Sequence, residues 1–434
     1  MTVVFRDVSV ADGTTPTRVH QDLIVEDGLI VDVRPTRGGY VSGDVVAEGG
    51  VLAPGLVDGH VHFRPVGREA NCILALHYLA HGITNVMCMD GFPEVLGLRD
   101  EIAAGNALGP RIWTTGPIQN DPDLSFEAGR ARALDQAAAG YDAIKVYNDL
   151  SLDGFRGLLA GARAVALPVV GHVVRSVGYE QTVRSDQSYI VHLEEFVYTR
   201  LGLEMPRLMD PRRIEIDLRV IDELCTDLIT CGKTVGTTIE ALVAAGHQVQ
   251  DAASWCARPD IRQLPAAIRD PWLPPGNDYA NRFTHPDHVR AFRRLVRLTG
   301  QLAVTLAARG VPLAAGSDAL NCGVPPGTSL LQELRNLTRA GLSDAAAMRA
   351  VMSYPLSSAG VEGRRIEVGA EADLILLSGD PFESVAHLDG VRGVLRGDRW
   401  VDVRELRSEM RSATARLDSA TFDPTDTAGC RTTP

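Results

Sequence analysis

The rhythm of apolar and polar positions changes twice along the chain. From residue 1 to 53, short apolar runs alternate with turns rich in Gly and Asp, and Glu26-Asp27-Gly28 separates two such runs. An Asp-Gly turn between apolar runs is typical of a β-hairpin. The same texture returns after residue 363, for example in residues 372–377 and 391–403. Neither end can bury a core alone, so we predict that residues 1–53 and 364–405 form one discontinuous β-sandwich domain.

Between these ends, strand, loop and helix follow one another in regular repetition. Helical stretches are predicted at residues 70–81, 127–139, 153–166 and 285–309. We place eight strand ends near His62, Met89, Gly116, Tyr147, Val173, Leu193, Thr238 and Asp318. Regular alternation of strands and helices implies a parallel sheet. The span from Gly55 to Asp318 is close to the about 250 residues of a typical (β/α)8 barrel. We therefore predict an α/β fold with a TIM-barrel catalytic domain over residues 54–363.

Two segments do not fit this repetition. Residues 239–284 are far longer than an ordinary strand-to-helix loop and contain Trp255 and Trp272. This insertion is either a lid over the barrel mouth or a helical addition at the periphery without contact to the site. The segment 406–434 is polar, and we expect a loosely held C-terminal extension.

Composition excludes several classes of partner. The formal net charge is −12 and no long basic run occurs, so we expect no binding to nucleic acid, whose phosphates need clustered Lys and Arg. The first residues do not form a leader, and no window approaches the roughly 20 uninterrupted apolar residues of a membrane span. We expect a cytoplasmic protein with a small-molecule substrate and no membrane partner. Assembly into a homo-oligomer is left open.

Seven scattered cysteines without a C-x-x-C pair favour reduced thiols and argue against a zinc cluster held by thiolates. Cys322 follows closely on a predicted strand end, but an ordinary small buried side chain explains it better than a catalytic thiol.

The apolar run that begins at Val51 ends in His60-Val61-His62. Strand side chains repeat every second residue, so both imidazoles leave the same face and point to one spot. Imidazole is the commonest metal ligand among side chains, and the pair could supply half of a metal site. Alone, the pair is only a weak sign of metal, and two partly buried histidines that are satisfied by hydrogen bonds explain it better.

Further polar residues lie at or near the ends of other predicted strands. In a TIM barrel, the active site lies at the carboxyl ends of the strands. Lys145 interrupts an apolar strand, and His172 and His192 each end one. A buried lysine of depressed pKa can take up carbon dioxide and become an anionic carbamate ligand, although a surface lysine or one paired with a carboxylate is the alternative. Each histidine alone is more often a satisfied core residue. Glu194 and Glu195 directly follow and could accept an imidazole N–H.

Asp318 ends the strand that begins at Val311. Ala314, Gly316 and Asp318 share one face, so small residues lead to a carboxylate at the rim. Such an aspartate could bind a metal and exchange a proton in metal-assisted hydrolysis. The alternative is an aspartate that caps the next helix.

The whole set resembles the amidohydrolase superfamily of metal-dependent hydrolases, in its dipeptidase-like, imidazolonepropionase-related branch. The resemblance rests on the segments 53–62, 144–147, 170–173, 192–195, 316–318 and 369–377. It implies two divalent metal ions, with zinc as the first expectation and manganese, iron or nickel as alternatives. It implies one ion held by His60, His62 and Asp318, a second held by His172 and His192, and a bridging carbamate on Lys145. It further implies that Lys145 and Asp318 are catalytic, with Asp318 moving a proton from a metal-bridged hydroxide to the leaving nitrogen. Asp58, on the face of His60, could orient its ring.

Rim residues are harder to assign. The spacing from His62 to Arg64 is similar to the start of dihydroorotases, in which that arginine binds a substrate carboxylate, and a guanidinium suits this task. Arg64 could equally lie at the surface. Tyr147 and Arg175 are further candidates for substrate binding. The segment 350–356 departs from the Thr-x-Asn-Pro-Ala turn of relatives, which puts local packing in doubt.

Our hypothesis is a hydrolase that cleaves an amide C–N bond of a small carboxylate-bearing substrate, such as a dipeptide or an N-acyl amino acid. A cyclic-amide hydrolase, or its reverse as a condensing cyclase, is the alternative, and a non-catalytic metal-binding scaffold is a third reading. The helical pairs His77/His81 and His285/His288 have spacings that can bind metal, but solvent-exposed histidines explain both better.

Overall fold

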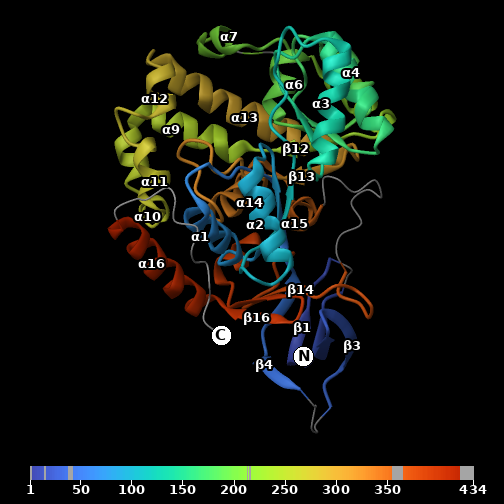
Figure 1. Cartoon of the computed structure of the whole chain (residues 1–434), viewed down its shortest axis with the longest axis vertical. Coiled ribbons are helices and arrows are strands. Elements are labelled where there is room, and N and C mark those ends of the chain that lie inside the picture. The colour runs from blue at the N-terminus through green and yellow to red at the C-terminus, as the bar shows by residue number, and fades with distance from the viewer. Residues whose placement is uncertain are drawn as a thin grey trace.

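The computed structural model describes residues 2–13, 16–37, 43–212, 214, 217–353 and 365–420. A β-rich part carries the N-terminus at the lower end of Figure 1, and helices surround parallel strands above it. The segment 350–356, which departs from the Thr-x-Asn-Pro-Ala turn of relatives, is described only up to residue 353.

Both ends of the chain contribute strands to one sheet. Its eight strands are β1 (Thr2–Val10), β2 (Arg18–Glu26), β3 (Leu29–Pro35), β4 (Asp44–Glu48), β5 (Val51–Pro54), β14 (Asp373–Leu377), β15 (Gly393–Arg396) and β16 (Arg399–Asp402). They follow the order β16-β15-β14-β5-β1-β2-β3, with β4 paired to β1. The antiparallel pair β5 and β14, in which Leu52 lies opposite Leu376, joins the two chain ends. Phe5, Leu23 and Leu374 belong to a separate apolar core. A two-layered sandwich and the domain boundaries stay predictions.

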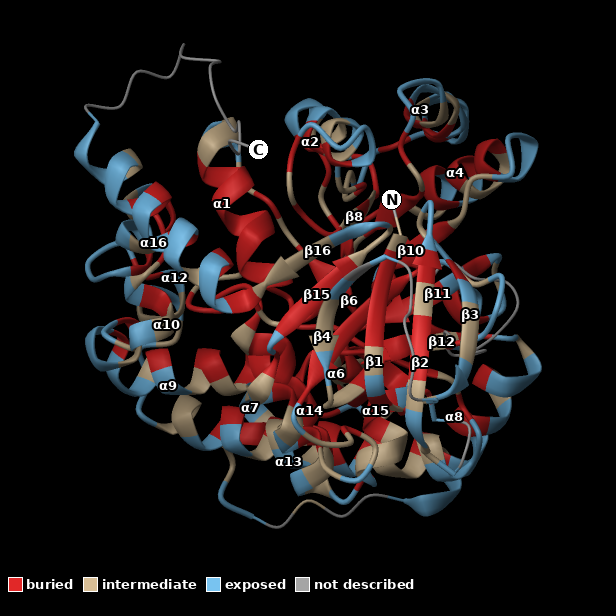
Figure 2. Ribbon diagram, turned by 90° about the horizontal axis from the view of Figure 1, so that it is seen from below, coloured by how far each residue is buried: buried red, intermediate tan, exposed pale blue. Residues whose placement is uncertain are grey.

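Eight parallel strands lie in the middle of the chain. They are β6 (Leu56–Val61), β7 (Ile83–Cys88), β8 (Arg111–Thr114), β9 (Ile144–Val146), β10 (Val169–Gly171), β11 (Gln187–Val191), β12 (Thr234–Thr237) and β13 (Leu313–Ala315). Each predicted strand end falls within three residues of an observed one. Short, almost fully buried apolar runs form these strands because neighbouring elements cover both of their faces (Figure 2).

The strands form a sheet of five, in the order β13-β12-β11-β10-β9, and a sheet of three, β6-β7-β8. Single parallel bridges connect the two sheets at Val61 with Ala319 and at Thr115 with Ala143. The backbone N–H of Asp318 also donates to the carbonyl of His60 at 2.8 Å. This parallel α/β arrangement fits a TIM barrel.

Helices follow most of these strands. They are α1 (Arg68–Leu79), α2 (Pro93–Ala103), α3 (Phe126–Ala138), α4 (Leu152–Ala164), α5 (Tyr179–Val183), α6 (Leu193–Thr199), α7 (Met205–Met209), α8 (Leu218–Thr230), α13 (Asp287–Ala308), α14 (Thr328–Ala340), α15 (Asp344–Met352) and the 3-10 turn η2 (Val385–Gly390). Their starts follow from local chemistry. Ser125 and Ser151 accept hydrogen bonds from backbone N–H groups at the first turns of α3 and α4.

The insertion begins with α9 (Ile239–Cys256), which is kinked at Asp251, and continues as a chain of short helical pieces. These are α10 (Pro259–Arg262), α11 (Ala266–Arg269), η1 (Asp270–Trp272) and α12 (Asp278–Arg282). The indole N–H of Trp255 donates to the carbonyl of Gly323 at 2.8 Å, so the insertion contacts the loop that follows β13.

The expectation of a loosely held extension from residue 406 is wrong for residues 406–419. They belong to helix α16 (Val403–Ser419), which buries Leu406 and Met410 and packs against α1. Figure 2 shows buried and exposed residues alternating along this helix. Apolar residues four positions apart share one helix face, so a largely polar segment can still dock. Residues 421–434 lie outside the described residues.

Within the described part of the chain, the structure contains no helix that is long and apolar enough to span a membrane.

Candidate metal centre

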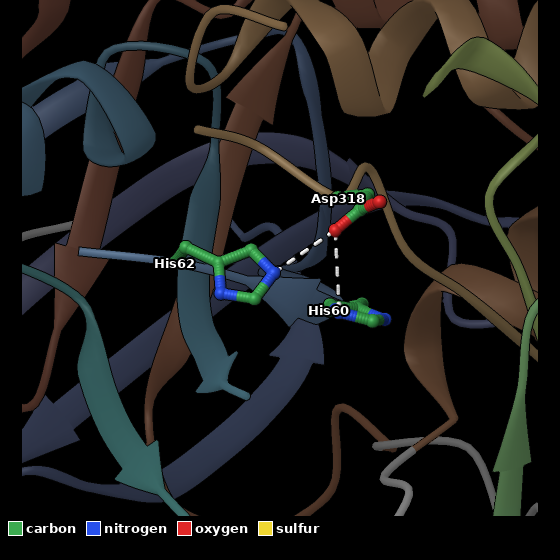
Figure 3. A group of neighbouring side chains, drawn as sticks. All are labelled: His60, His62 and Asp318. Carbon is green, nitrogen blue, oxygen red and sulfur yellow. Dashed lines mark hydrogen bonds and ion pairs between the residues drawn. The ribbon is translucent and has the colours of Figure 1, made fainter. Parts of the chain in front are cut away.

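Three predicted ligands converge at one point. His60 lies near the end of β6, His62 directly follows that strand, and Asp318 lies just beyond β13 (Figure 3). The Nε2 atoms of His60 and His62 lie 3.3 and 3.0 Å from the same Asp318 oxygen, Oδ1. One ligand atom from each of the three residues lies within 4.8 Å of the other two. The structure therefore brings together residues that are far apart in the sequence.

The small residues before Asp318 have a steric reason. A Cβ added to Gly316 would lie 2.8 Å from the Cβ of His60 and 2.9 Å from its backbone nitrogen. Only glycine allows β13 to approach β6 this closely. Asp318 itself has a left-handed backbone with φ of 58°, a conformation that aspartate tolerates better than most residues. The close approach brings the Asp318 carboxylate to both imidazoles.

His172 and His192 form a second pair beside the first. Their ring centres lie 4.4 Å apart, and the ring of His192 lies 4.7 Å from that of His60. Nδ1 of His172 contacts Asn148 Oδ1 at 3.1 Å and Glu195 Oε1 at 3.2 Å, and Nδ1 of His192 contacts Thr238 Oγ1 at 2.8 Å.

These contacts fix the orientation of both rings through Nδ1. The two Nε2 atoms are left to serve as ligands, which is how a metal-binding histidine is usually held.

Lys145 is the central residue of β9 and is only 1% exposed. Burial lowers the pKa of its ammonium to about 8, although the charges of Asp318, Asp90 and Glu195 act in the opposite direction. Among the described residues, no carboxylate lies within ion-pair distance of its Nζ. The alternatives of a surface lysine or a direct ion pair therefore do not describe this side chain.

The electrostatics of the cluster favour neutral imidazoles and an ionised aspartate. Burial, together with the charge of Lys145, holds the pKa of His60 and His172 well below the usual value. Burial also lowers the pKa of His192. For Asp318, burial acts to raise the pKa, but its electrostatic interaction with His60 and its hydrogen bond with His62 hold it well below its usual range. Neutral imidazole and carboxylate are the forms that bind metal.

The expected role of Asp58 is wrong. Its carboxylate accepts hydrogen bonds from the Ser317 backbone N–H at 2.8 Å and from the Ser317 hydroxyl at 2.6 Å. It also accepts from the backbone N–H of His60 at 3.3 Å, whereas Nδ1 of the His60 ring has no hydrogen-bond partner. Asp58 therefore ties β6 to the chain after β13 and does not orient the His60 ring.

The donor set fits a divalent ion such as zinc. Bonds of 2.0–2.1 Å in tetrahedral geometry place neighbouring ligand atoms about 3.3 Å apart. The two contacts between Nε2 atoms and Asp318 Oδ1, at 3.3 and 3.0 Å, are close to this spacing. A buried cluster of neutral nitrogens and one carboxylate is also the kind of site that selects such ions.

A cavity of about 860 Å³ opens on this cluster. His172, His192 and Asp318 line it, together with two of the three predicted rim residues, Tyr147 and Arg175. A second cavity, of about 730 Å³, lies at the opposite ends of the strands, where Val169, Thr234 and Pro312 line it. Function in this fold sits at the carboxyl ends of the strands, so the first cavity is the candidate active site.

The two predicted arginines differ in what they do. The guanidinium of Arg175 makes two hydrogen bonds with Glu195, at 2.8 and 2.7 Å, and lies 4.8 Å over the ring of Tyr198. Arg64 is absent from the lining of the site cavity, and its guanidinium donates to the carbonyl of Leu320 at 2.8 Å. Sequence spacing placed Arg64 near the ligands but could not show that its side chain is engaged elsewhere.

Several lining residues were not predicted. They belong to the insertion and to the segments around it: Ala241, Leu242, Ala245, Asp278, Tyr279, Arg282, Phe283, Phe292 and Asn321. Of the two readings of the insertion, contact with the site is therefore confirmed. The apolar and aromatic side chains around α12 were the available signal, but an irregular segment has no periodicity that aims them.

The other candidates do not form sites. His77 is buried, and burial lowers its pKa to about 3, so this histidine is not exposed as expected. His285 is exposed and His288 is partly buried, and the backbone N–H of His285 donates to Nδ1 of His288 at 3.2 Å. Cys322 donates to Gln248 Oε1 at 3.3 Å, and burial raises the pKa of its thiol, which disfavours a reactive thiolate.

Comparison with known sequences gives a short match. No family model matches the chain. An adenine deaminase from Deinococcus deserti is 31% identical over 140 residues, which are 30% of this chain and 24% of the deaminase. The chain thus matches about a quarter of the length of this curated relative.

Comparison with solved structures covers nearly the whole chain. A bottromycin amidohydrolase superposes with a TM-score of 0.70 at 24% identity, covering 98% of this chain and 92% of that one. A Xaa-Pro dipeptidase with bound methionine superposes with a TM-score of 0.65 at 18% identity, covering 93% and 100%. This likeness, which extends over the strands that carry the cluster, shows that the chain has the same fold as these two proteins.

Proposed function

We propose that this protein is a metal-dependent hydrolase that cleaves an amide C–N bond in a small carboxylate-bearing substrate, such as a dipeptide or an N-acyl amino acid. The observation that carries the proposal is the meeting of His60, His62 and Asp318, the last of which lines a large cavity. His172 and His192 lie beside them. The parallel strands of the two sheets form one closed (β/α)8 barrel in this proposal.

His60, His62 and Asp318 would hold one divalent ion, and His172 and His192 a second. Lys145 would bridge them after its Nζ attacks carbon dioxide, loses a proton and becomes a carbamate. The depressed pKa of Lys145 supports this, because only the neutral amine can attack. When bound, the ions would supply an activated water and polarise the amide carbonyl.

The protein's own groups would carry out the remaining steps. The Asp318 carboxylate would accept a proton as water adds to the carbonyl, and would deliver it to the leaving nitrogen. Asn321 donates to Asp318 Oδ2 at 3.2 Å and would keep that oxygen oriented. Glu195 would hold the His172 ring, and Arg175 would neutralise Glu195 through its two hydrogen bonds.

The substrate carboxylate needs a cation in the cavity wall. Arg175 is engaged by Glu195, whereas Arg282 on α12 is largely exposed. Its guanidinium makes a long contact with Asp278, at 3.4 Å, and lies 5.5 Å over the ring of Phe283. We therefore assign carboxylate binding to Arg282 in place of Arg64. A guanidinium is well suited to carboxylates.

Metal content and activity test the proposal together. We expect at least one and up to two divalent ions per chain after growth with added zinc or manganese, measured by elemental analysis. The same preparation should hydrolyse members of a panel of dipeptides and N-acyl amino acids. Less than one ion per chain would refute the metal site.

Three further arms of the panel separate the alternatives. Cyclic amides, assayed at mildly acidic and alkaline pH, test for a cyclic-amide hydrolase or a cyclase. Adenine tests for the activity named in the Deinococcus relative. Metal binding without turnover of any compound would favour a scaffold protein.

A further inference from the structure

The insertion gives the candidate active site an apolar wall. Its members are Ala241, Leu242, Ala245, Tyr279, Phe283 and Phe292, all of which line the site cavity. Ala241, Leu242 and Ala245 lie on α9 and are at most 8% exposed, and Phe292 of α13 is 4% exposed. The ring of Phe283 packs edge-on against Phe292, with 5.1 Å between centres. The rest of the lining is largely polar, so the apolar lining residues come mainly from the insertion and α13.

This wall is fixed in place. The buried side chain of Asn277 accepts from the backbone N–H of Ala280 at 2.9 Å and donates to Gln248 Oε1 at 2.8 Å. The amide of Gln248 in turn donates to the carbonyl of Cys322 at 2.8 Å. These bonds connect α12 through α9 to the loop that also carries Asp318. An apolar wall held against the catalytic loop behaves as a preformed part of the site.

We infer that this wall is a subsite for an aliphatic or aromatic side chain on the carboxylate-bearing half of the substrate. The inference rests on the proposed function. Arg282 and Phe283 are consecutive, which places the cation proposed for the carboxylate next to the apolar wall. Ala241 and Ala245 are four residues apart on α9 and therefore lie on one face, where their small side chains leave room for a substrate group.

Enzyme kinetics test the subsite on the metal-loaded protein. We expect kcat/KM to be at least about tenfold higher for N-acetyl-leucine and N-acetyl-phenylalanine than for N-acetyl-glycine, because burying several methylene groups favours the larger side chains. Ala241→Leu should fill the space and remove most of this preference, by lowering kcat/KM for the two larger substrates more than for N-acetyl-glycine. The control Ala253→Leu, at an exposed position of the same helix, should keep the preference.

A second variant and a binding measurement guard against misfolding. Phe283→Ala should weaken the preference by enlarging the subsite. Calorimetry with zinc-loaded protein and acetate, butyrate and hexanoate isolates the apolar contribution, since the carboxylate is constant. We expect affinity to rise about fourfold per methylene group in the unmodified protein and less in Ala241→Leu.

The possible failures differ. Hydrolysis with no dependence on side-chain size, or affinities that stay flat along the carboxylate series, would overturn the subsite. No hydrolysis together with affinities that rise along the series would refute the proposed function and leave the apolar subsite standing.

Discussion

At the scale of single residues, Lys145 provides the strictest test of the proposed two-metal site. The chain has two lysines, Lys145 and Lys233, and both are buried. Lys233 donates to the carbonyl of Ser185 at 2.6 Å and lines the cavity at the other end of the strands. It is therefore a matched control with the same chemistry in a different place.

We predict that Lys145→Ala loses metal and most activity, by more than the about 10–100-fold typical for removing a residue that is hydrogen-bonded to a ligand. A short carboxylic acid should restore part of both, because it can take the place of the carbamate. Elemental analysis and kinetics with and without propionate measure the effect. Unchanged metal content would exclude the carbamate.

The same pair of lysines allows a direct spectroscopic test. Protein exchanged with ¹³C-bicarbonate should show one carbamate carbon signal that persists in Lys233→Arg and disappears in Lys145→Arg. A signal that followed Lys233 would contradict the assignment.

Asp318→Asn should lower kcat by about 10²–10⁴-fold while at least one metal ion is retained, because the amide can still offer an oxygen but cannot carry the proton. Steady-state kinetics and metal analysis of the same sample separate the loss of proton transfer from the loss of metal. Asn321→Ala serves as a milder comparison, since it removes only the bond to Asp318 Oδ2. Full activity of Asp318→Asn would rule out the proton transfer.

Glu333 of α14 makes stability depend on pH. Burial raises its pKa from 4.5 to about 7, and the buried charges of Glu240 and Asp58 lie close enough to interact with it. The folded state keeps this proton up to about pH 7, whereas the unfolded chain releases it near pH 4.5. The folded state therefore loses stability from this group as the pH rises between these values.

In Glu333→Gln, the free energy of unfolding should fall by roughly 3 kcal/mol less between pH 4.5 and 8 than in the unmodified protein, because glutamine carries no proton to lose. Urea unfolding at several pH values measures it. The exposed Glu409→Gln is the control and should leave the pH profile as it is. An unchanged slope in Glu333→Gln would assign the pH dependence to other groups.

At the scale of elements, the strand ends were the predictable part of the site. Side chains alternate along a strand, so His60 and His62 had to share a face, and the ends of parallel strands meet at one edge. The positions of His172, His192 and Asp318 follow from the same rule. Arg64, two residues beyond His62, lies past the end of β6, where no period constrains its direction. The insertion has no such period either, which is why its lining residues were missed.

The order of the insertion depends on one asparagine. Asn277 caps α12 and also donates to Gln248 Oε1 and to the carbonyl of Trp272. Asn277→Ala should destabilise the protein by about 2–4 kcal/mol, since it removes the cap and leaves buried acceptors unpaired.

Urea unfolding and limited proteolysis within residues 270–284 would detect this loss. Asn281→Ala, at an exposed position with one bond to the carbonyl of Pro275, should cost less than about 1 kcal/mol. Equal effects of the two substitutions would contradict the anchoring role.

At the scale of the whole molecule, the C-terminal helix joins parts that the sequence suggested were separate. α16 packs on α1, and Asp418 near its end accepts from the backbone N–H of Ala266 at 2.8 Å and pairs with Arg269 at 3.1 Å. The prediction of a loose extension relied on the polar composition of the segment. It gave no weight to Leu406 and Met410, whose spacing of four residues places them on one helix face. Composition describes the average of a segment, whereas docking depends on one face of a helix.

Leu406→Ala should lower the free energy of unfolding by about 2–4 kcal/mol, as expected for a buried leucine that leaves a cavity. The exposed Arg411→Ala on the same helix should have little effect. Denaturant titration compares the two variants. A loss of less than 1 kcal/mol in Leu406→Ala would show that α16 is held only weakly.

The contact between His62 and Asp318 spans 256 positions of sequence. Such distant pairings form slowly, because closing a long loop costs conformational entropy. An unfolded chain offers the His60–His62 pair without Asp318 beside it. Uptake of a metal ion during refolding would therefore report the step at which β6 meets β13. The bound ion would then stabilise the contact between these two strands.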